Sequence, residues 1–274
     1  MLAPLAALLV LGLSAEAPAP DPAPAVLAEI PAAEPAAARP PPAPVYRLYP
    51  AVDAAVMATS AVTIAVPEIF ADEIIRFRCP CDPSEVNGFD RGAIGNHSAL
   101  AGTVSDVTLV ASIAVPPVLD LLDVGMGEAF LTDLAVYAQV MLVNGALAQI
   151  AKYTVQRPIP RTYAGDPAFL HSPSGYGSFF SGHTSTVFAA LTTTAMTARL
   201  RHGERWWPWA VAVVVGSSVA VERVAAGRHF PSDVLAGAAV GTTAGVVIPW
   251  LHVRTADTVT LVPVRRGLGI AVRF

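Results

Sequence analysis

Six apolar runs, each free of Asp, Glu, Lys, Arg and His, are the feature of this chain that most constrains its fold. A membrane-spanning helix needs about 20 mostly apolar residues, and the third and sixth runs approach this length without their flanks. The runs are rich in Ala, Gly, Ser and Thr, which lets helices pack closely in a bilayer. We therefore predict an all-α bundle of about five to six helices, embedded in a membrane and covering residues 51–252. The runs are residues 54–67, 107–119, 134–151, 184–198, 206–221 and 234–251.

The composition narrows the class of protein. Charged residues make up 14% of the chain, against roughly 25% in soluble domains, and such an apolar chain is not disordered along its whole length. A net charge of −4, without a Lys/Arg block, argues against a nucleic-acid-binding protein, which needs a basic surface. A soluble bundle with buried helices shares this composition and is the alternative architecture. We infer no obligate protein partner.

Both ends of the chain differ from the bundle. Residues 1–17 are apolar and end in Ala15-Glu16-Ala17, the pattern of a signal-peptide cleavage site, although no basic residue precedes the run. They are predicted to be a signal peptide or a plain hydrophobic N-terminus. Residues 18–50 contain eleven prolines, which favours an extended tether. The tail, residues 253–274, alternates β-branched residues and can form a short hairpin turning near Arg265-Arg266-Gly267.

Arginine placement predicts an orientation. The 199–205 loop carries three arginines, so the positive-inside rule places it in the cytoplasm. The loops at 152–183 and 222–233 then lie on the opposite face, in the periplasm of a bacterial-type inner membrane. This arrangement agrees with an exported N-terminus only if residues 54–67 form a peripheral helix that does not span. An exported soluble or peripheral periplasmic protein is the alternative.

Cys79 and Cys81 are separated by one residue. A disulfide between such close cysteines is geometrically tight but feasible. In an exported chain a disulfide and two free thiols are both open interpretations.

Three polar segments border the apolar runs and contain the residues suited to chemistry. On the predicted topology all three lie at one end of the bundle. Cations and the free N–H groups of a helix N-terminus bind phosphate, and a histidine beside an aspartate can act as an oriented nucleophile or acid. The segments hold Lys152, Arg157 and Arg161 in the first, Ser181, Gly182 and His183 in the second, and Arg223, His229 and Asp233 in the third.

The order and spacing of these residues resemble the type 2 phosphatidic acid phosphatase superfamily, which also contains bacterial acid phosphatases and vanadium-dependent haloperoxidases. The resemblance covers about residues 100–252. The third motif, Arg-x5-His-x3-Asp, fits at Arg223. Three positions depart from the family pattern: Ile159 replaces the arginine of Lys-x6-Arg-Pro, Glu222 replaces a serine, and Phe180 replaces a proline.

The resemblance implies a role for each motif residue. His229 is the expected nucleophile, Asp233 accepts a hydrogen bond from its other ring nitrogen, and His183 is the general acid and base. Lys152, Arg223, Ser181 and Gly182 are expected to bind the phosphate oxygens. The arginine missing at position 159 requires a substitute, for which we expect Arg157 first and Arg161 second, because alternate side chains of an extended chain share one face.

The function implied is that of a phosphatase that needs no metal or cofactor. Its substrate would be a phosphate monoester or diphosphate, most naturally of a membrane lipid, such as phosphatidic acid, phosphatidylglycerol phosphate or undecaprenyl diphosphate. Two alternatives remain. Vanadate mimics phosphate, so a vanadate-dependent haloperoxidase can use the same residues, and the departures at Ile159 and Glu222 suit a non-catalytic bundle that only binds lipid phosphates.

Overall fold

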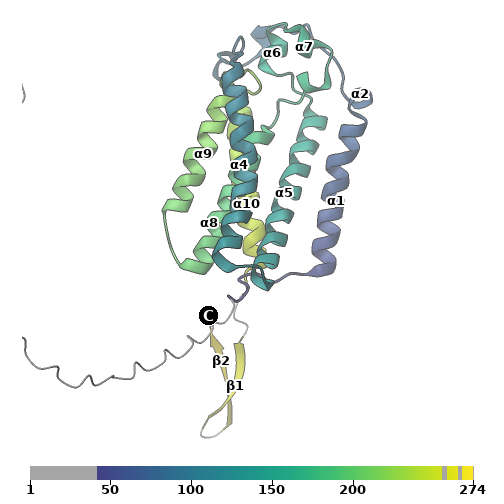
Figure 1. The fold of residues 1–274 in the computed structure, drawn as a ribbon. Coiled ribbons are helices and arrows are strands. Elements are labelled where there is room, and N and C mark those ends of the chain that lie inside the picture. The colour runs from purple at the N-terminus through teal and green to yellow at the C-terminus, as the bar shows by residue number, and fades with distance from the viewer. Residues whose placement is uncertain (1–41, 255–257, 265–266, 274) are drawn as a thin grey trace, which may run out of the picture. The chain divides into compact units, whose positions relative to one another are not determined.

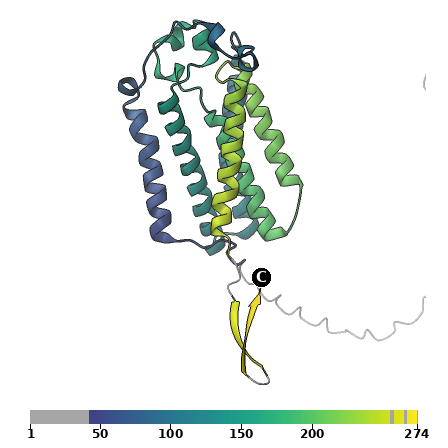
Figure 2. The same ribbon diagram turned by 180° about the vertical axis from the view of Figure 1, so that it is seen from behind.

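The computed structural model describes residues 42–254, 258–264 and 267–273. Six long helices run side by side and form the bundle (Figures 1 and 2). The prediction of an all-α bundle of about five to six helices is confirmed. The long helices are α1 (Pro50–Ile69), α4 (Ala99–Val124), α5 (Glu128–Val155), α8 (Gly182–His202), α9 (Trp207–Ala225) and α10 (Pro231–His252).

Short elements cover one end of the bundle, at the top of Figure 1. They occupy the connections from α1 to α4 and from α5 to α8. They are α2 (Ala71–Ile74), η1 (Pro83–Glu85), α3 (Gly88–Arg91), α6 (Pro160–Tyr163), α7 (Pro167–Leu170) and η2 (Pro173–Gly175). In the α1–α4 connection Cys79 and Cys81 form a disulfide.

The predicted tail region contains two strands. Strands β1 (Thr258–Val264) and β2 (Gly267–Arg273) pair antiparallel in one hairpin. The predicted turn residues Arg265 and Arg266 lie outside the described residues, as do residues 1–41, which include the predicted signal peptide and most of the predicted tether.

Helix α8 lies in the interior of the bundle, where it packs against α4, α5, α9 and α10. Glycines allow its closest contact. A Cβ on Gly241 of α10 would lie 2.0 Å from the carbonyl oxygen of Ser185, and one on Gly237 would lie 2.6 Å from that of Ser181. Only glycine fits at such a distance, so these two positions fix the start of α8 against the first half of α10.

The outside of the bundle is apolar. Helices α1, α4, α5, α9 and α10 are long and apolar enough to cross a membrane. Their exposed side chains include Val107, Leu122, Val214 and Leu235. In the more polar α8, by contrast, Thr184, Thr192 and Thr193 are buried. Apolar residues outside and polar residues inside are what a lipid environment requires. The bundle is therefore a membrane bundle rather than a soluble one.

The expectation that residues 54–67 form a short peripheral helix is wrong. Helix α1 runs from Pro50 to Ile69 and packs along α5. Its first turn therefore lies at the same end of the bundle as the loop between α8 and α9 (Figure 1). A cytoplasmic 199–205 loop would place residues 42–49 in the cytoplasm as well. Hence a cleaved export signal and the predicted orientation exclude each other.

The predicted tether also extends too far along the chain. Tyr46 is 1% exposed, and its hydroxyl lies 2.8 Å from Oγ1 of Thr197 in α8. Tyr46 also forms a β-bridge with Val253, and the N–H of Arg47 donates to the carbonyl of His252 at 2.7 Å. Residues 46–49 therefore belong to the bundle, because a buried aromatic ring and paired backbone groups fix them there.

Candidate active site

A cavity of about 260 Å³ lies where the three predicted segments meet. Lys152 comes from the last turn of α5, Gly182 and His183 from the first turn of α8, and Arg223 from the last turn of α9. The loop between α9 and α10 adds His229. The polar side chains that line the cavity are Glu68, Lys152, His183, Arg223, Arg228 and His229, together with Tyr153 and Ser174 at its edge.

His229 is held in one tautomer by the backbone. Its side chain is buried, and Nδ1 lies 2.7 Å from the carbonyl oxygen of Ser178. A carbonyl only accepts hydrogen bonds, so Nδ1 carries the proton and the neutral ring keeps a lone pair on Nε2. Burial and the charge of Arg223 lower the pKa of His229 well below its usual value. The ring is therefore neutral at physiological pH and suited to nucleophilic attack.

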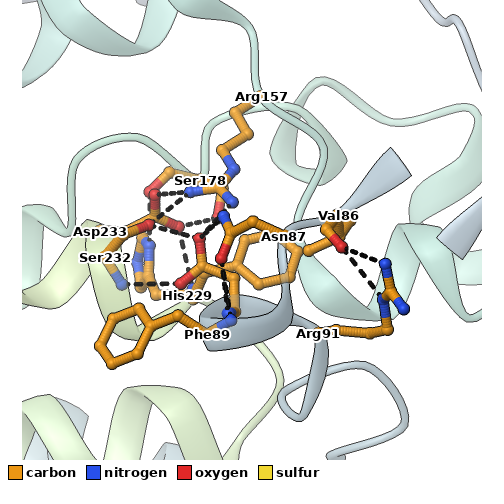
Figure 3. Close-up of polar contacts among 11 residues, drawn as sticks. Val86, Asn87, Phe89, Arg91, Arg157, Ser178, His229, Ser232 and Asp233 are labelled. Atoms are coloured by element: carbon orange, nitrogen blue, oxygen red, sulfur yellow. Dashed lines mark hydrogen bonds and ion pairs between the residues drawn. The ribbon is translucent and has the colours of Figure 1, made fainter. Parts of the chain in front are cut away.

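Asp233 does not accept from His229 as we expected. It is the third residue of α10, and its carboxylate turns back to cap the helix: Oδ2 accepts from the N–H of Phe230 at 2.9 Å and from the Ser178 hydroxyl at 2.5 Å. The carbonyl of Ser178 holds His229. Asp233 thus acts on His229 through Ser178, by fixing the segment that supplies the carbonyl (Figure 3).

The guanidinium of Arg157 belongs to a buried network of hydrogen bonds and ion pairs beside the cavity. Nη1 donates to Asp233 at 2.6 Å and Nη2 to Asp90 of α3 at 2.8 Å, and the guanidinium lies 4.1 Å from the ring centroid of Phe230. Ser232 donates to Asp90 through both its N–H and its hydroxyl. Burial opposes ionisation of Asp90, but the hydrogen bonds from Arg157 and Ser232 prevail and lower its pKa to about 2.

Arg161 is also engaged away from the cavity. Its guanidinium pairs with Asp166, with Nε to Oδ2 at 2.7 Å, and lies 4.7 Å from the ring centroid of Phe169. The expectation that Arg157 or Arg161 replaces the missing arginine is therefore wrong. We assumed an extended chain, but α6 begins at Pro160, so alternation does not extend to Arg161.

Ser181 does not line the cavity either. It is fully buried and forms the N-cap of α8, where its hydroxyl accepts from the N–H of Thr184 and its own N–H donates to the carbonyl of Asp233 at 3.1 Å. Ser181 is a helix cap that ties α8 to α10. Gly182 does face the cavity, and a Cβ on it would lie 3.6 Å from Nζ of Lys152. The Lys152 ammonium therefore lies against the N-terminus of α8.

Asp106 of α4 is a site residue that the motifs did not predict. Oδ1 lies 2.8 Å from Nε2 of His183 and 3.2 Å from Nη1 of Arg223. Nε of Arg223 is buried and has no partner among the described residues. The carboxylate of Asp106 thus touches the two groups that an anionic ligand would contact. The signal available was a carboxylate in the first, otherwise apolar part of α4, well before the two aspartates near the end of that helix. A carboxylate at such a place in a membrane protein indicates a functional site.

Residues 133–256 match the model of the PAP2 superfamily. The matched region contains the motif residues that the cavity brings together. This part of the chain is therefore similar to the PAP2 superfamily. Among the residues that the structure describes, no group of three or more His, Cys, Asp or Glu side chains could hold a metal ion.

Three proteins are similar to this chain. A lipid A 1-phosphatase of Porphyromonas gingivalis is 33% identical over 113 residues, which are 40% of this chain and 22% of the relative, so the match spans about a fifth of the relative's length. The crystal structure of LpxE from Aquifex aeolicus matches with a TM-score of 0.42 and 22% identity, over 58% of this chain and 90% of that one. A transmembrane PAP2 type phosphatidylglycerolphosphate phosphatase from Bacillus subtilis matches with a TM-score of 0.42 and 17% identity, over 73% and 94%.

Proposed function

We propose that this protein belongs to the PAP2 superfamily and hydrolyses a phosphate monoester or diphosphate through a phosphohistidine intermediate at His229. The observation that carries the proposal is the hydrogen bond from Nδ1 of His229 to the Ser178 carbonyl, which leaves Nε2 as a free nucleophile. The cavity around it is lined by three cationic side chains, Lys152, Arg223 and Arg228, and by one carboxylate, Glu68. A second carboxylate, Asp106, pairs with Arg223, so the positive charges still outnumber the negative ones. Such an excess of positive charge favours an anionic ligand.

In the first step Nε2 of His229 attacks phosphorus, and the bond to the leaving oxygen breaks. Negative charge on the other phosphoryl oxygens is stabilised by Lys152, by Arg223 and by the N–H groups at the start of α8. Ser181 caps Thr184, so the N–H of Gly182 remains for the ligand. Donors that are already in place when charge develops lower the barrier more than flexible ones.

His183 supplies the proton transfers. It gives a proton to the leaving oxygen in the first step and takes one from water in the second, when the water oxygen attacks phosphorus and releases His229. A protonated imidazole beside Arg223 and Lys152 is unfavourable. The Asp106 carboxylate, 2.8 Å from Nε2 of His183, offsets this repulsion and keeps His183 able to act as an acid.

The substrate class we propose is a lipid phosphate. The cavity opens at one end of a membrane bundle, and Ala71 and Ile75 of the α1–α2 corner give it an apolar wall. The relative from Porphyromonas gingivalis is named for dephosphorylating lipid A. Candidate substrates are therefore lipid A, phosphatidic acid, phosphatidylglycerol phosphate and undecaprenyl diphosphate.

We propose that the site faces the periplasm. The three arginines at 199–205 place that loop in the cytoplasm by the positive-inside rule, and the site lies at the other end of the bundle. Residues 42–49 are then cytoplasmic, because α1 begins at the same end of the bundle as the 199–205 loop. The test is labelling of Glu204→Cys with a membrane-impermeant thiol reagent in intact cells. Protection until the inner membrane is permeabilised supports this orientation, and immediate labelling contradicts it.

The test of the function is a phosphate-release assay with the full chain in detergent micelles. Each candidate lipid and one soluble phosphate ester are assayed, with and without a chelator, beside His229→Gln as the matched control. We expect release that survives the chelator and disappears in the variant. Halide oxidation that requires vanadate, or no turnover of any substrate, would contradict the proposal.

A further inference from the structure

Residue 159, where the family pattern has an arginine, lines the cavity but is uncharged in this chain. Ile159 is 2% exposed and lines the cavity. Its N–H donates to the carbonyl of Gly175 at 2.9 Å, which fixes the segment. The segment around Ile159 therefore contributes no cation to the site, although the family pattern has an arginine at this position.

Arg228 lines the same cavity, and it stands at one of the unspecified x positions of the third motif, to which no role is assigned. Its guanidinium makes no hydrogen bond or ion pair with any residue that the structure describes, whereas Arg157 and Arg161 are each paired with aspartates. Its carbon Cζ lies 4.6 Å from the ring centroid of Phe169. Arg228 thus has a fixed stacking partner and unused hydrogen-bond donors.

The backbone explains why position 228 lies close to position 159. The N–H of Arg161 donates to the carbonyl of Gly227 at 3.2 Å, which joins the two segments directly. Gly227 has φ +67°, and a Cβ on it would lie 1.9 Å from the carbonyl oxygen of Asn96. Only glycine allows this turn to pack so closely. The turn therefore holds the residue after it, Arg228, beside the segment of Ile159.

We propose that Arg228 binds the phosphoryl oxygens in place of the arginine that is missing at position 159. The ligand is a tetrahedral or trigonal-bipyramidal oxyanion, phosphate or vanadate, held in two-donor geometry by the planar guanidinium. Phe169 restricts the rotation of this guanidinium, as stacking on an aromatic ring does. This proposal depends on the proposed function in one respect, namely that the bound anion is a phosphoryl group.

Arg161→Gln is the matched control for Arg228→Gln. Both guanidiniums stack on Phe169, at 4.7 and 4.6 Å, but only Arg228 lines the cavity. Binding of inorganic orthovanadate to the full chain is measured by calorimetry, and the melting temperature of each variant reports folding. We expect Arg228→Gln to weaken vanadate binding about 10- to 100-fold, the range for one charged hydrogen-bonded contact. Arg161→Gln should bind vanadate as the wild type does.

Kinetics and a rescue variant separate phosphate binding from a structural role. Loss of one pre-organised donor in Arg228→Gln should lower kcat about 100- to 1000-fold, with a smaller change in KM. Arg228→Lys should restore little activity, because an ammonium lacks the two parallel N–H donors of a guanidinium. Adding Ile159→Arg to Arg228→Gln should recover part of both vanadate binding and kcat, because it restores a guanidinium at the family position.

Each outcome decides between the two proposals. Vanadate binding by Arg228→Gln at the wild-type level, or equal loss in Arg161→Gln, overturns the role of Arg228. If the wild type binds vanadate through Arg228 but releases no phosphate from any substrate, the proposed hydrolysis fails and the role of Arg228 stands. If the wild type binds no vanadate, both proposals fail.

Discussion

Replacing Arg157 with alanine tests the assignment of this residue to the fold rather than to the substrate. Arg157 pairs with Asp90 and Asp233, whose side chains are 1% and 0% exposed. Removing one partner of a buried ion pair costs about 3–5 kcal/mol, because a buried charge stays uncompensated. For a domain of this size, that loss lowers the melting temperature by about 6–20 °C.

Arg161→Ala provides the matched control. Its pair with Asp166 is about a quarter exposed on each side, and partly solvated pairs of this kind contribute at most about 1 kcal/mol. The assay is thermal unfolding of both variants in detergent, beside the wild type. Melting temperatures of the two variants that agree within about 2 °C would refute the assignment of Arg157 to a buried network.

The difference in stability between the wild type and Arg157→Ala depends on pH because Asp90 titrates differently in the two proteins. With Arg157 present its pKa is about 2, so its contribution to the wild type is complete above the unfolded value near 3.9 and is lost only as the pH falls towards about 2. Without Arg157, Asp90 loses the strongest of the hydrogen bonds that oppose its burial, so its pKa rises and the folded variant takes up a proton at higher pH than the wild type does. The gap between wild type and Arg157→Ala should therefore narrow from about pH 8 to about pH 5.

Three further predictions follow from the site and the fold. Asp106→Asn should lower kcat about 10- to 100-fold and make it more sensitive to rising pH, because His183 loses the carboxylate that favours its protonated form; an unchanged pH–rate profile would count against this role. Burial and Arg223 lower the pKa of His229, so the acidic limb of kcat/KM should lie below about pH 6.5, and a limb above that value contradicts a neutral buried His229. Tyr46→Ala should destabilise the bundle by about 3–5 kcal/mol and Tyr46→Phe by about 1 kcal/mol in thermal unfolding, whereas similar small losses would mean that Tyr46 belongs to the tether.

The apolar runs predicted the helices because a bilayer leaves few alternatives for a long run without charges. The length that a membrane-spanning helix requires gave a wrong prediction for α1, because its uncharged run, residues 54–67, is shorter than that length. Its charged ends find partners inside the bundle: Oδ1 of Asp53 lies 3.1 Å from Nε2 of His252, and Glu68 accepts from Gln149. Paired carboxylates allow the helix to continue to Ile69, and such partners are distant in the sequence.

The motifs predicted five of the residues that line the cavity, but not the partners of the arginines. The five are Lys152, Gly182, His183, Arg223 and His229. Whether an arginine faces the cavity depends on which carboxylates meet it, and Asp90 lies 67 residues before Arg157. Arg228 reaches the cavity because a glycine turn packs against Asn96. Contacts between segments so far apart leave no periodic pattern in the chain. The sequence therefore predicts where the site lies, while the structure shows which cations are available to a ligand.

The most direct test of the central claim is detection of phosphohistidine at His229. The His183→Ala variant is mixed briefly with a phosphate ester that has a good leaving group, because such a leaving group needs no acid while breakdown of the intermediate still needs the base. The protein is quenched in alkali, which preserves phosphohistidine, and its peptides are analysed by mass spectrometry. We predict a phosphoryl group on the peptide that contains His229 and none in His183→Ala/His229→Gln. A phosphoryl group on another residue, or none in His183→Ala although the wild type turns the same ester over, would contradict the mechanism.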